Sequence, residues 1–344
     1  MKVVPDPGVP VRPVTLADLA REAGTSASTA SRALSGRGYV SSDARRKLLE
    51  AAERLGYVPN LSARALKQRT SRVVGVVVSD LGNQFYARVA AGIEQTLREG
   101  GYQMMILGDN SDRDEELDAA RTFAAMHAPG VIMTPVSGDA AGLLAAKGIA
   151  VVEVDRRLAP TACDAVVIDN VRGAREATSH LLSLGHRRVG LLVVDTDWTT
   201  DAGRVEGYRS AHELAALPVD ERLIVRVPVN ALDAAERIEQ LFAYESPTAI
   251  FAANNRLAEE AWRVLRKRRL RLPEDFSLVG FDDVSWMEMV EPGITVVDQP
   301  TVEIGRCAGR LLLERLADGG APPRLECLKP SLILRGSTAP PRVP

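Results

Sequence analysis

Residues 15–34 read TLADLAREAGTSASTASRAL, and this stretch predicts two short helices joined by a tight turn. Thr15 is a suitable N-cap for the first helix, because its hydroxyl can accept a hydrogen bond from the first turn. The apolar residues of that helix recur at helical spacing, at Leu16, Leu19, Ala20 and Ala23. Gly24 suits the left-handed position that ends a helix, and the second helix is predicted over residues 27–34.

A third helix is predicted directly after this pair. Ser41 or Ser42 is its N-cap and Gly56 its end. The side chains expected to point inward are Leu48, Leu49, Ala52 and Leu55. Two short helices joined by a tight turn and braced by a third are typical of a helix-turn-helix module.

The charge of the chain is divided unevenly around this module. The net charge of the 344 residues is −2, but residues 1–70 carry 12 Lys and Arg against 6 Asp and Glu, and the other 274 residues carry 31 against 39. A basic N-terminal part on an acidic body is expected of a nucleic-acid-binding module joined to a second function. With 46% apolar and 26% charged residues, the composition excludes collagen-like, disordered and membrane-protein classes.

The remainder of the chain alternates short β-branched runs with amphipathic helices. Strands are predicted over residues 73–79, 103–107, 131–134, 150–154, 189–194, 223–227, 249–252 and 277–281. Helices are predicted near 84–98, 114–127, 140–147, 171–184, 202–216, 231–243 and 256–269. This alternation favours parallel sheets, here two similar α/β lobes, with a ligand bound beyond the carboxyl ends of the strands.

The second helix of a helix-turn-helix unit places its N-terminal half in the major groove of DNA. Here that half offers Ala27, Ser28, Thr29 and Arg32 to the bases, while Ser26 and Ser31 can reach phosphates. A single Arg can bind guanine O6 and N7 in bidentate fashion. The competing interpretation is a solvated, Ser-rich helix in a small α domain.

Ordered motifs along the chain resemble the LacI/GalR (lactose-repressor) family of transcription regulators. They are VTLADLAREAGTS at 14–26, TASRAL at 29–34, AAERLGYVPN at 51–60, ARALK at 63–67, VVIDN at 166–170, LGHRRVG at 184–190, RVEGY at 204–208 and VGFDD at 279–283. The resemblance runs from about residue 13 to 338. It implies a dimeric DNA-binding regulator whose effector domain is related to periplasmic sugar-binding proteins. It also places Thr15 in the DNA-contacting set, Ala27 and Ser28 at base-reading positions, and Leu66 at the leucine that wedges into the minor groove.

Residues 59–70 are expected to form a hinge helix. Asn60 is a suitable N-cap, but residues 61–67 make fewer than two turns, so this helix needs DNA and a dimer partner to become ordered. Inserting Leu66 between base steps costs unstacking energy that a bent duplex offsets with further contacts. Arg64 and Lys67 can neutralise nearby phosphates. An ordinary basic linker is the alternative.

Polar and aromatic residues follow the predicted strands and form the candidate effector site. They are Asn83, Phe85, Tyr86, Asp155, Trp198, Arg204, Asn254 and Asp282. By the resemblance, Asp155, Arg204, Asn254 and Asp282 match positions that hydrogen-bond the effector in sugar-responsive members. Sugar hydroxyls need paired donors and acceptors, and aromatic faces cover the apolar surface of the ring. Taken singly, the Asp and Asn residues could be helix caps, Arg204 could pair with a surface carboxylate, and the two aromatic residues could belong to the core.

Other function classes have weaker support. Asp155 and Asp282 could be a glycosidase pair, but the chain lacks the glycine-rich loops of nucleotide enzymes and the Gly-x-Ser-x-Gly elbow of hydrolases. Its four His and three Cys show no metal-ligand spacing, so we expect no enzyme, metal or cofactor. A periplasmic sugar-binding protein would need a signal peptide, whereas the start of this chain is Pro-rich. A nucleoside effector or a phosphoprotein corepressor remains an alternative within the family.

The sequence therefore predicts a cytoplasmic, homodimeric repressor that binds a palindromic DNA operator and a sugar-like effector, without membrane contact. The expected divisions are a disordered leader (1–12), a helix-turn-helix domain (13–58), a hinge (59–70), an effector and dimerisation domain (71–338) and a tail (339–344). Within the effector domain, one lobe takes residues 71–168 and 300–327, and the other takes residues 169–299 and 328–338.

Overall fold

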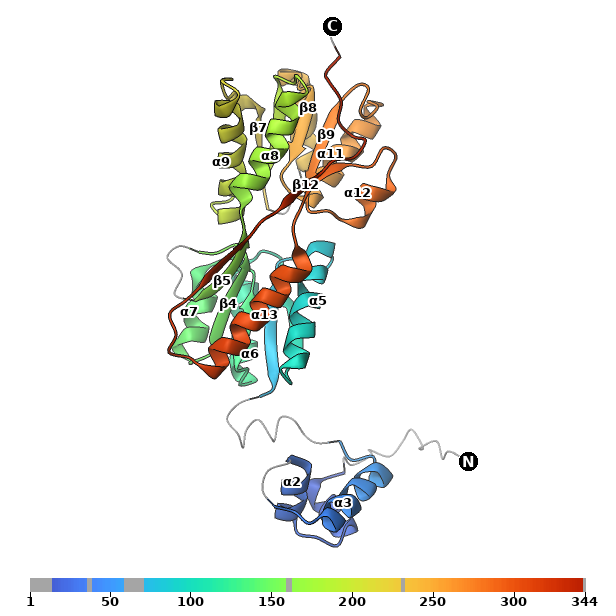
Figure 1. The fold of residues 1–344 in the computed structure, drawn as a ribbon, viewed down its shortest axis with the longest axis vertical. Coiled ribbons are helices and arrows are strands. Elements are labelled where there is room, and N and C mark those ends of the chain that lie inside the picture. The colour runs from blue at the N-terminus through green and yellow to red at the C-terminus, as the bar shows by residue number, and fades with distance from the viewer. Residues whose placement is uncertain (1–13, 36–38, 59–70, 159–162, 230–232, 343–344) are drawn as a thin grey trace, which may run out of the picture. The chain divides into compact units, whose positions relative to one another are not determined.

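The structure, a computed structural model, describes residues 14–35, 39–58, 71–158, 163–229 and 233–342 (Figure 1). The chain divides into two compact units, Met1–Gln68 and Arg69–Pro344. The leader and the hinge, with Asn60, Arg64, Leu66 and Lys67, lie outside the described residues.

The N-terminal unit contains α1 (Leu16–Glu22), α2 (Ala27–Ser35) and α3 (Ser42–Leu55). Thr15 caps α1 as predicted, in a capping box in which the Thr15 hydroxyl oxygen accepts from the Asp18 backbone N–H at 3.2 Å. Gly24 and Gly56 follow the ends of α1 and α3 with φ of +63° and +61°, so the predicted helix ends are confirmed. The core of this unit contains the fully buried Leu19, Ala30, Leu48 and Ala51.

One inward-facing residue was predicted wrongly in α3. Leu49 is 54% exposed, and Ala51 is buried in its place. The helical period explains the difference, since Leu48, Ala51, Ala52 and Leu55 share one face and Leu49 lies about 100° away from Leu48.

The strands of the C-terminal unit form two six-stranded sheets within the described residues (Figure 1). The first contains β1 (Val73–Val78), β2 (Gln103–Gly108), β3 (Gly130–Met133), β4 (Ala150–Asp155), β5 (Asp164–Ile168) and β11 (Leu325–Leu328), in the order β11-β5-β4-β3-β1-β2. The second contains β6 (Val189–Val194), β7 (Ile224–Val227), β8 (Ala249–Ala252), β9 (Ser277–Phe281), β10 (Thr295–Asp298) and β12 (Ser331–Ile333), in the order β12-β10-β9-β8-β6-β7. The described pairings are parallel except that of β12 with β10. The predicted fold class is confirmed.

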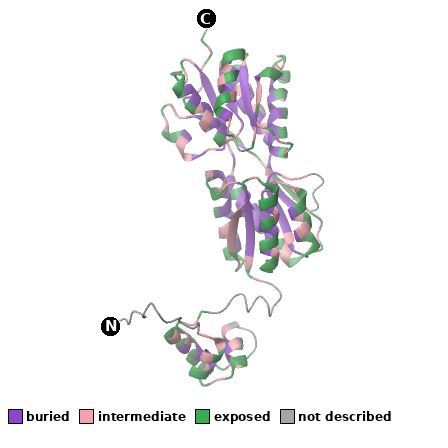
Figure 2. Cartoon of the chain, turned by 180° about the vertical axis from the view of Figure 1, so that it is seen from behind, coloured by how far each residue is buried: buried purple, intermediate pink, exposed green. Residues whose placement is uncertain are grey.

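Helices cover the sheets, whose strands are largely buried (Figure 2). They are α5 (Gln84–Glu99), α6 (Arg113–Ala125), α7 (Gly138–Ala146), α8 (Asn170–Ser183), α9 (Thr199–Leu214), α10 (Ala234–Glu245), α11 (Asn255–Lys267), α12 (Ser285–Met289) and α13 (Thr301–Ala317), with a 3₁₀ turn at Glu221–Leu223. In Figure 1, α5 and α13 lie side by side over the first sheet. Their close approach requires glycine, since a Cβ at Gly92 would meet the Val302 carbonyl and one at Gly305 the Val89 carbonyl.

The sequence patterns missed the elements at which the chain passes between the lobes. The missed strands are β5, β10, β11 and β12, and the missed helices are α12 and α13. The chain leaves the first sheet after β5, returns to the first lobe between β10 and α13, and crosses again between β11 and β12. Each lobe is therefore built from segments distant in sequence.

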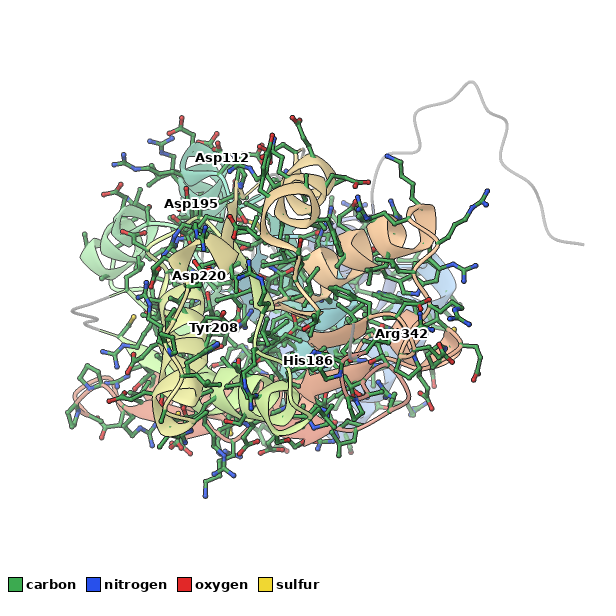
Figure 3. All side chains as sticks on the ribbon, turned by 90° about the horizontal axis from the view of Figure 1, so that it is seen from above. Asp112, His186, Asp195, Tyr208, Asp220 and Arg342 are labelled. Carbon is green, nitrogen blue, oxygen red and sulfur yellow. The ribbon has the colours of Figure 1, made fainter. Side chains whose placement is uncertain are left out.

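Described residues of the expected C-terminal tail pack on the second lobe. His186 is buried, and one of its ring nitrogens lies 3.0 Å from the Ala339 carbonyl oxygen. Arg342 forms an ion pair of 2.6 Å with Asp275. His186 and Arg342 are both labelled in Figure 3. In the described part of the chain, no helix combines the length and apolar character that crossing a bilayer would demand.

Candidate ligand cavity and helix-turn-helix surface

A cavity of about 340 Å³ lies between the two lobes of the C-terminal unit. All eight residues of the predicted effector site line it: Asn83, Phe85, Tyr86, Asp155, Trp198, Arg204, Asn254 and Asp282. Its wall also contains residues that the sequence reasoning missed, among them Ser79, Asp80, Arg156, Asp201, Arg256 and Gln299. The sequence reasoning therefore identified the location and part of the wall.

The ends of two strands bring carboxylates to this cavity from opposite lobes. Asp155 is the last residue of β4 and Asp282 directly follows β9. Both have φ of +68°, the left-handed region that Asp tolerates better than most residues. Because carboxyl ends of parallel strands meet at one edge of a sheet, the same turn in each lobe directs an acid to the space between them.

Arg204 reaches the cavity from α9 and is held by neutral groups. Its Nε donates to the Asn170 side-chain oxygen at 2.9 Å, and its Nη1 donates to the Ala253 carbonyl. Its guanidinium carbon lies 4.0 Å from the centre of the Phe281 ring. Arg204 is only 4% exposed, so the alternative of a surface ion pair is wrong.

The carboxylates at the cavity differ in what holds them. Asp282 accepts hydrogen bonds from the Gln299 side-chain amide and from the Asn255 backbone N–H. Burial raises the pKa of Asp282, although Arg204 and the Gln299 bond oppose this rise. Burial also raises the pKa of Asp155 to about 6, against the attraction of Arg204 and Arg156. Among the described residues, no hydrogen bond reaches the Asp155 carboxylate.

Arg156 is the main cationic residue that the sequence reasoning missed. Its guanidinium carbon lies 3.5 Å from the centre of the Trp198 ring, which joins the two lobes by a cation–π contact. Its Nη2 donates to the Ser79 hydroxyl, but its Nε has no partner in the described residues. Gln299 Oε1 is likewise buried without a partner. Both residues line the cavity, so these atoms would gain partners from a polar ligand only if the surrounding side chains moved to admit it. The adjacency of Arg156 to Asp155 was the available sequence signal.

The two asparagines are both helix caps and cavity residues. Asn83 caps α5 by accepting from the Phe85 backbone N–H at 3.0 Å, and Asn254 caps α11 by accepting from the Leu257 N–H at 2.8 Å. These bonds use the side-chain oxygens, so the amide nitrogens are the groups that remain for a ligand. Asn83 also accepts from the Asn255 side chain at 2.9 Å, across the lobes.

The aromatic residues are shared between the core and the cavity. Phe85 is 5% exposed and belongs to the core of the C-terminal unit. Tyr86 meets it edge to face, with ring centres 5.0 Å apart, and burial raises the pKa of its hydroxyl. Both residues therefore pack with the core and also line the cavity.

The helix-turn-helix surface places the predicted base-reading side chains outward. Ser26, Ala27, Ser28 and Arg32 are exposed, Thr29 and Ser31 are half-buried, and Ala30 and Ala33 face the core. Ser26 holds the start of α2 by accepting from the Thr29 N–H at 3.2 Å. The Nε of Arg32 donates to the Ser28 carbonyl at 3.3 Å, which holds this side chain along the helix.

Comparisons with known proteins identify both the helix-turn-helix unit and the two-lobed unit. Residues 15–60 match the model of bacterial regulatory proteins of the lacI family, and residues 178–338 match the periplasmic binding protein-like domain. The transcriptional regulator DegA of Bacillus subtilis is 34% identical, over 95% of this chain and 98% of its own. The solved complex of the regulator CelR with cellobiose is 31% identical, with a TM-score of 0.71 over 95% of this chain and 100% of its own. The lac repressor dimer bound to operator is 25% identical, with a TM-score of 0.82 over the same shares. The chain belongs to the LacI family of bacterial regulatory proteins.

Proposed function

We propose that this protein is a transcription repressor whose affinity for DNA is controlled by a sugar-like effector bound in the cavity between the lobes. The observation that carries the proposal is the cavity itself, a space between the lobes that carboxylate, amide, guanidinium and aromatic side chains line from both sides. The protein also carries a helix-turn-helix unit of the same family as the lac repressor, which was solved on its operator.

On the DNA side, Ala27, Ser28, Thr29 and Arg32 of α2 read base edges in the major groove. The remaining contacts, to phosphate and the minor groove, are assigned to Thr15, Ser26, Ser31, Asn60, Arg64, Leu66 and Lys67. The Thr15 hydroxyl already bonds to Asp18 in the capping box, so we expect its contact to DNA to contribute less than those of the other residues. A homodimer would present two such units to a palindromic operator.

On the effector side, the lining groups suit a molecule with several hydroxyls. Asp155 and Asp282 accept hydrogen bonds, Arg204 and the Asn83 and Asn254 amides donate them, and Phe85, Tyr86 and Trp198 offer apolar faces. The related regulator CelR was solved with cellobiose, a ligand of this kind. No catalytic step is assigned, since the relatives compared are named as regulators.

Effector control follows from the location of the cavity. A ligand that contacts both lobes favours the arrangement of the lobes that it fits best, and only its differential affinity can shift the equilibrium. Coupling between effector and operator binding is typically about 1–3 kcal/mol. The three crossings between the lobes connect the cavity to both sheets.

The proposed function is tested by selecting bound sequences from a random DNA library with the full chain. We expect enrichment of a palindrome, and a change in its affinity of about fivefold or more with at least one sugar of a panel. Arg32→Ala should weaken binding by about 1–3 kcal/mol and relax base preference at one position of each half-site. Arg21→Ala, on the exposed face of α1, is the control. Absence of any enriched sequence would overturn the proposed role in transcription. Turnover of a glycoside at a catalytic concentration of the protein would show that the protein is an enzyme.

A further inference from the structure

The ligand cavity contains more buried acidic than basic side chains. Asp155, Asp201 and Asp282 are 8%, 4% and 7% exposed and line the same space. The buried cations of the described lining are Arg156 and Arg204, which are 3% and 4% exposed. Three carboxylates therefore face two guanidinium groups.

The third lining arginine does not correct this imbalance. Arg256 is largely exposed, and its guanidinium pairs with Asp80 at 2.6 Å. This pair spans the two lobes at the side of the cavity and neutralises itself. It leaves no excess positive charge for a ligand.

The two buried guanidinium groups already use part of their hydrogen-bonding capacity. Arg204 gives its Nε and one Nη1 bond to uncharged acceptors, and Arg156 gives an Nη2 bond to Ser79. Phosphate and carboxylate groups are bound most strongly by a forked pair of free Arg donors. The cavity offers single donors among excess carboxylates.

Asp201 contributes the carboxylate that creates the excess. It lies in the first turn of α9, and its Oδ2 accepts from the Thr196 hydroxyl at 2.6 Å and from the Thr200 hydroxyl at 3.5 Å. Burial raises the pKa of Asp201, whereas the charge of Arg204 and these hydrogen bonds oppose the rise. In the described residues, no group of acidic side chains, Cys or His is arranged to hold a metal ion that would neutralise it.

We propose that the cavity selects an uncharged polyhydroxyl ligand and rejects phosphorylated sugars and sugar acids, and that Asp201 is a residue that determines this selectivity. The inference rests on the proposed function only in treating the cavity as the effector site. An anionic ligand would place a fourth negative charge beside three carboxylates. Like charges brought together in a buried site should weaken its binding roughly 100-fold relative to the neutral parent.

The test compares neutral and anionic members of matched pairs by calorimetry at pH 8, without DNA. The pairs are cellobiose with cellobionate, glucose with glucose 6-phosphate, and ribose with ribose 5-phosphate. We expect only neutral members to bind the full chain. For the pair whose neutral member binds, Asp201→Asn should reduce the ratio of the anionic to the neutral dissociation constant at least tenfold. Asp197→Asn is the control, because Asp197 is an exposed neighbour outside the cavity lining and the substitution changes the net charge equally. Tighter binding of an anionic member would overturn the proposal.

A second measurement needs no ligand. Relief of carboxylate crowding should raise the melting temperature of Asp201→Asn by about 2–4 °C, while Asp197→Asn stays near the wild type. Loss of a negative charge in the first turn of α9 opposes the rise, so a rise identifies crowding as the larger effect. A fall in the melting temperature would overturn the premise of excess charge. If no sugar of the panel binds, this measurement is the deciding test. Because both measurements omit DNA, failure of the repressor function would leave their result standing.

Discussion

The carboxylates of Asp155 and Asp282 occupy matching places in the two lobes, yet their surroundings differ. Each lies at the carboxyl end of a central strand with φ of +68°. Asp282 is held by hydrogen bonds from Gln299 and Asn255, whereas Asp155 is stabilised only by the charges of Arg204 and Arg156. The same backbone turn has thus produced one acid fixed before any ligand binds and one that retains its hydrogen-bonding capacity.

Because of this difference, the two acids should respond differently when a ligand binds. A pre-organised acceptor such as Asp282 costs little to order when a ligand binds. An acid without hydrogen bonds, such as Asp155, is costly in the empty cavity and gains most from a ligand hydroxyl. Under the proposed function, the second lobe would supply a fixed anchor, and the first lobe would supply a group whose stability depends on the ligand.

Arg204→Ala is expected to have the largest effect on this comparison, because Arg204 attracts both acids. Removing it leaves buried carboxylates without their cation and should lower the free energy of unfolding by about 3–5 kcal/mol. All three tryptophans, Trp198, Trp262 and Trp286, lie in the C-terminal unit, so their fluorescence in urea reports on this unit alone. Arg172→Ala, which breaks a half-exposed pair with Glu176, is the control and should cost under about 1 kcal/mol. Equal losses in the two variants would contradict the role of Arg204.

The pH dependence of stability should separate the two acids next. The pKa of Asp155 in the folded protein is about 6, above its ordinary value of 3.8, so the folded state binds the proton more tightly. This contribution to stability is present below about pH 4 and is lost as the pH rises towards 6. The loss should be on the order of 2–3 kcal/mol.

The measurement is a set of urea titrations between pH 4 and 8 on the wild type and Asp155→Asn. The variant should lessen the decline between pH 4 and 6. Burial also raises the pKa of Asp109 and Glu153, each to about 7, so the part of the decline that these two groups cause, from about pH 4 to 7, should persist in the variant. An unchanged profile below pH 6 would show that Asp155 is not the titrating group.

At a fixed pH of 8, the corresponding asparagine variants should change stability in opposite directions. Asp282→Asn places an amide against donors on Gln299 and Asn255 and should lower the free energy of unfolding by about 1–3 kcal/mol. Asp155→Asn removes a desolvated charge that accepts no hydrogen bond and should raise it by about 1 kcal/mol. Asparagine tolerates the left-handed backbone at both positions, so backbone strain does not contribute to the difference in stability between the two variants. A destabilised Asp155→Asn would remove the distinction between the acids.

The smallest effect is expected at the Asp80–Arg256 pair, which joins the lobes near the surface. Its side chains are 32% and 61% exposed, so solvent screens the attraction. A double-mutant cycle with Asp80→Asn and Arg256→Gln should give a coupling of at most about 1 kcal/mol, which falls in 0.5 M salt. The matched control is Arg263 with Glu259, a pair within α11. A coupling free energy well above that of the control, and unchanged by salt, would show that this pair contributes substantially to holding the lobes together.

The sequence patterns predicted eight strands, β1–β4 and β6–β9, within about one residue of their observed ends, because most of them are short apolar runs rich in β-branched residues. They missed α13 and the strands beside the crossings. β11 is an edge strand whose residues are mostly exposed, so it carries no apolar run. Within the site, the patterns found the acids that follow β4 and β9, but not Asp201, whose position in the first turn of α9 looks like an ordinary acidic helix start.

The sequence by itself determined the helix-turn-helix unit, the parallel α/β lobes and the location of the cavity between the lobes, since these follow from local periodicity, caps and strand ends. Only the tertiary structure decided which charges meet there. Asp80 and Arg256 are 176 residues apart in the chain, and Arg156 and Trp198 come from different lobes. Their contacts depend on the three crossings between the sheets, and the electrostatic balance of a buried cavity depends on distances that local patterns do not contain.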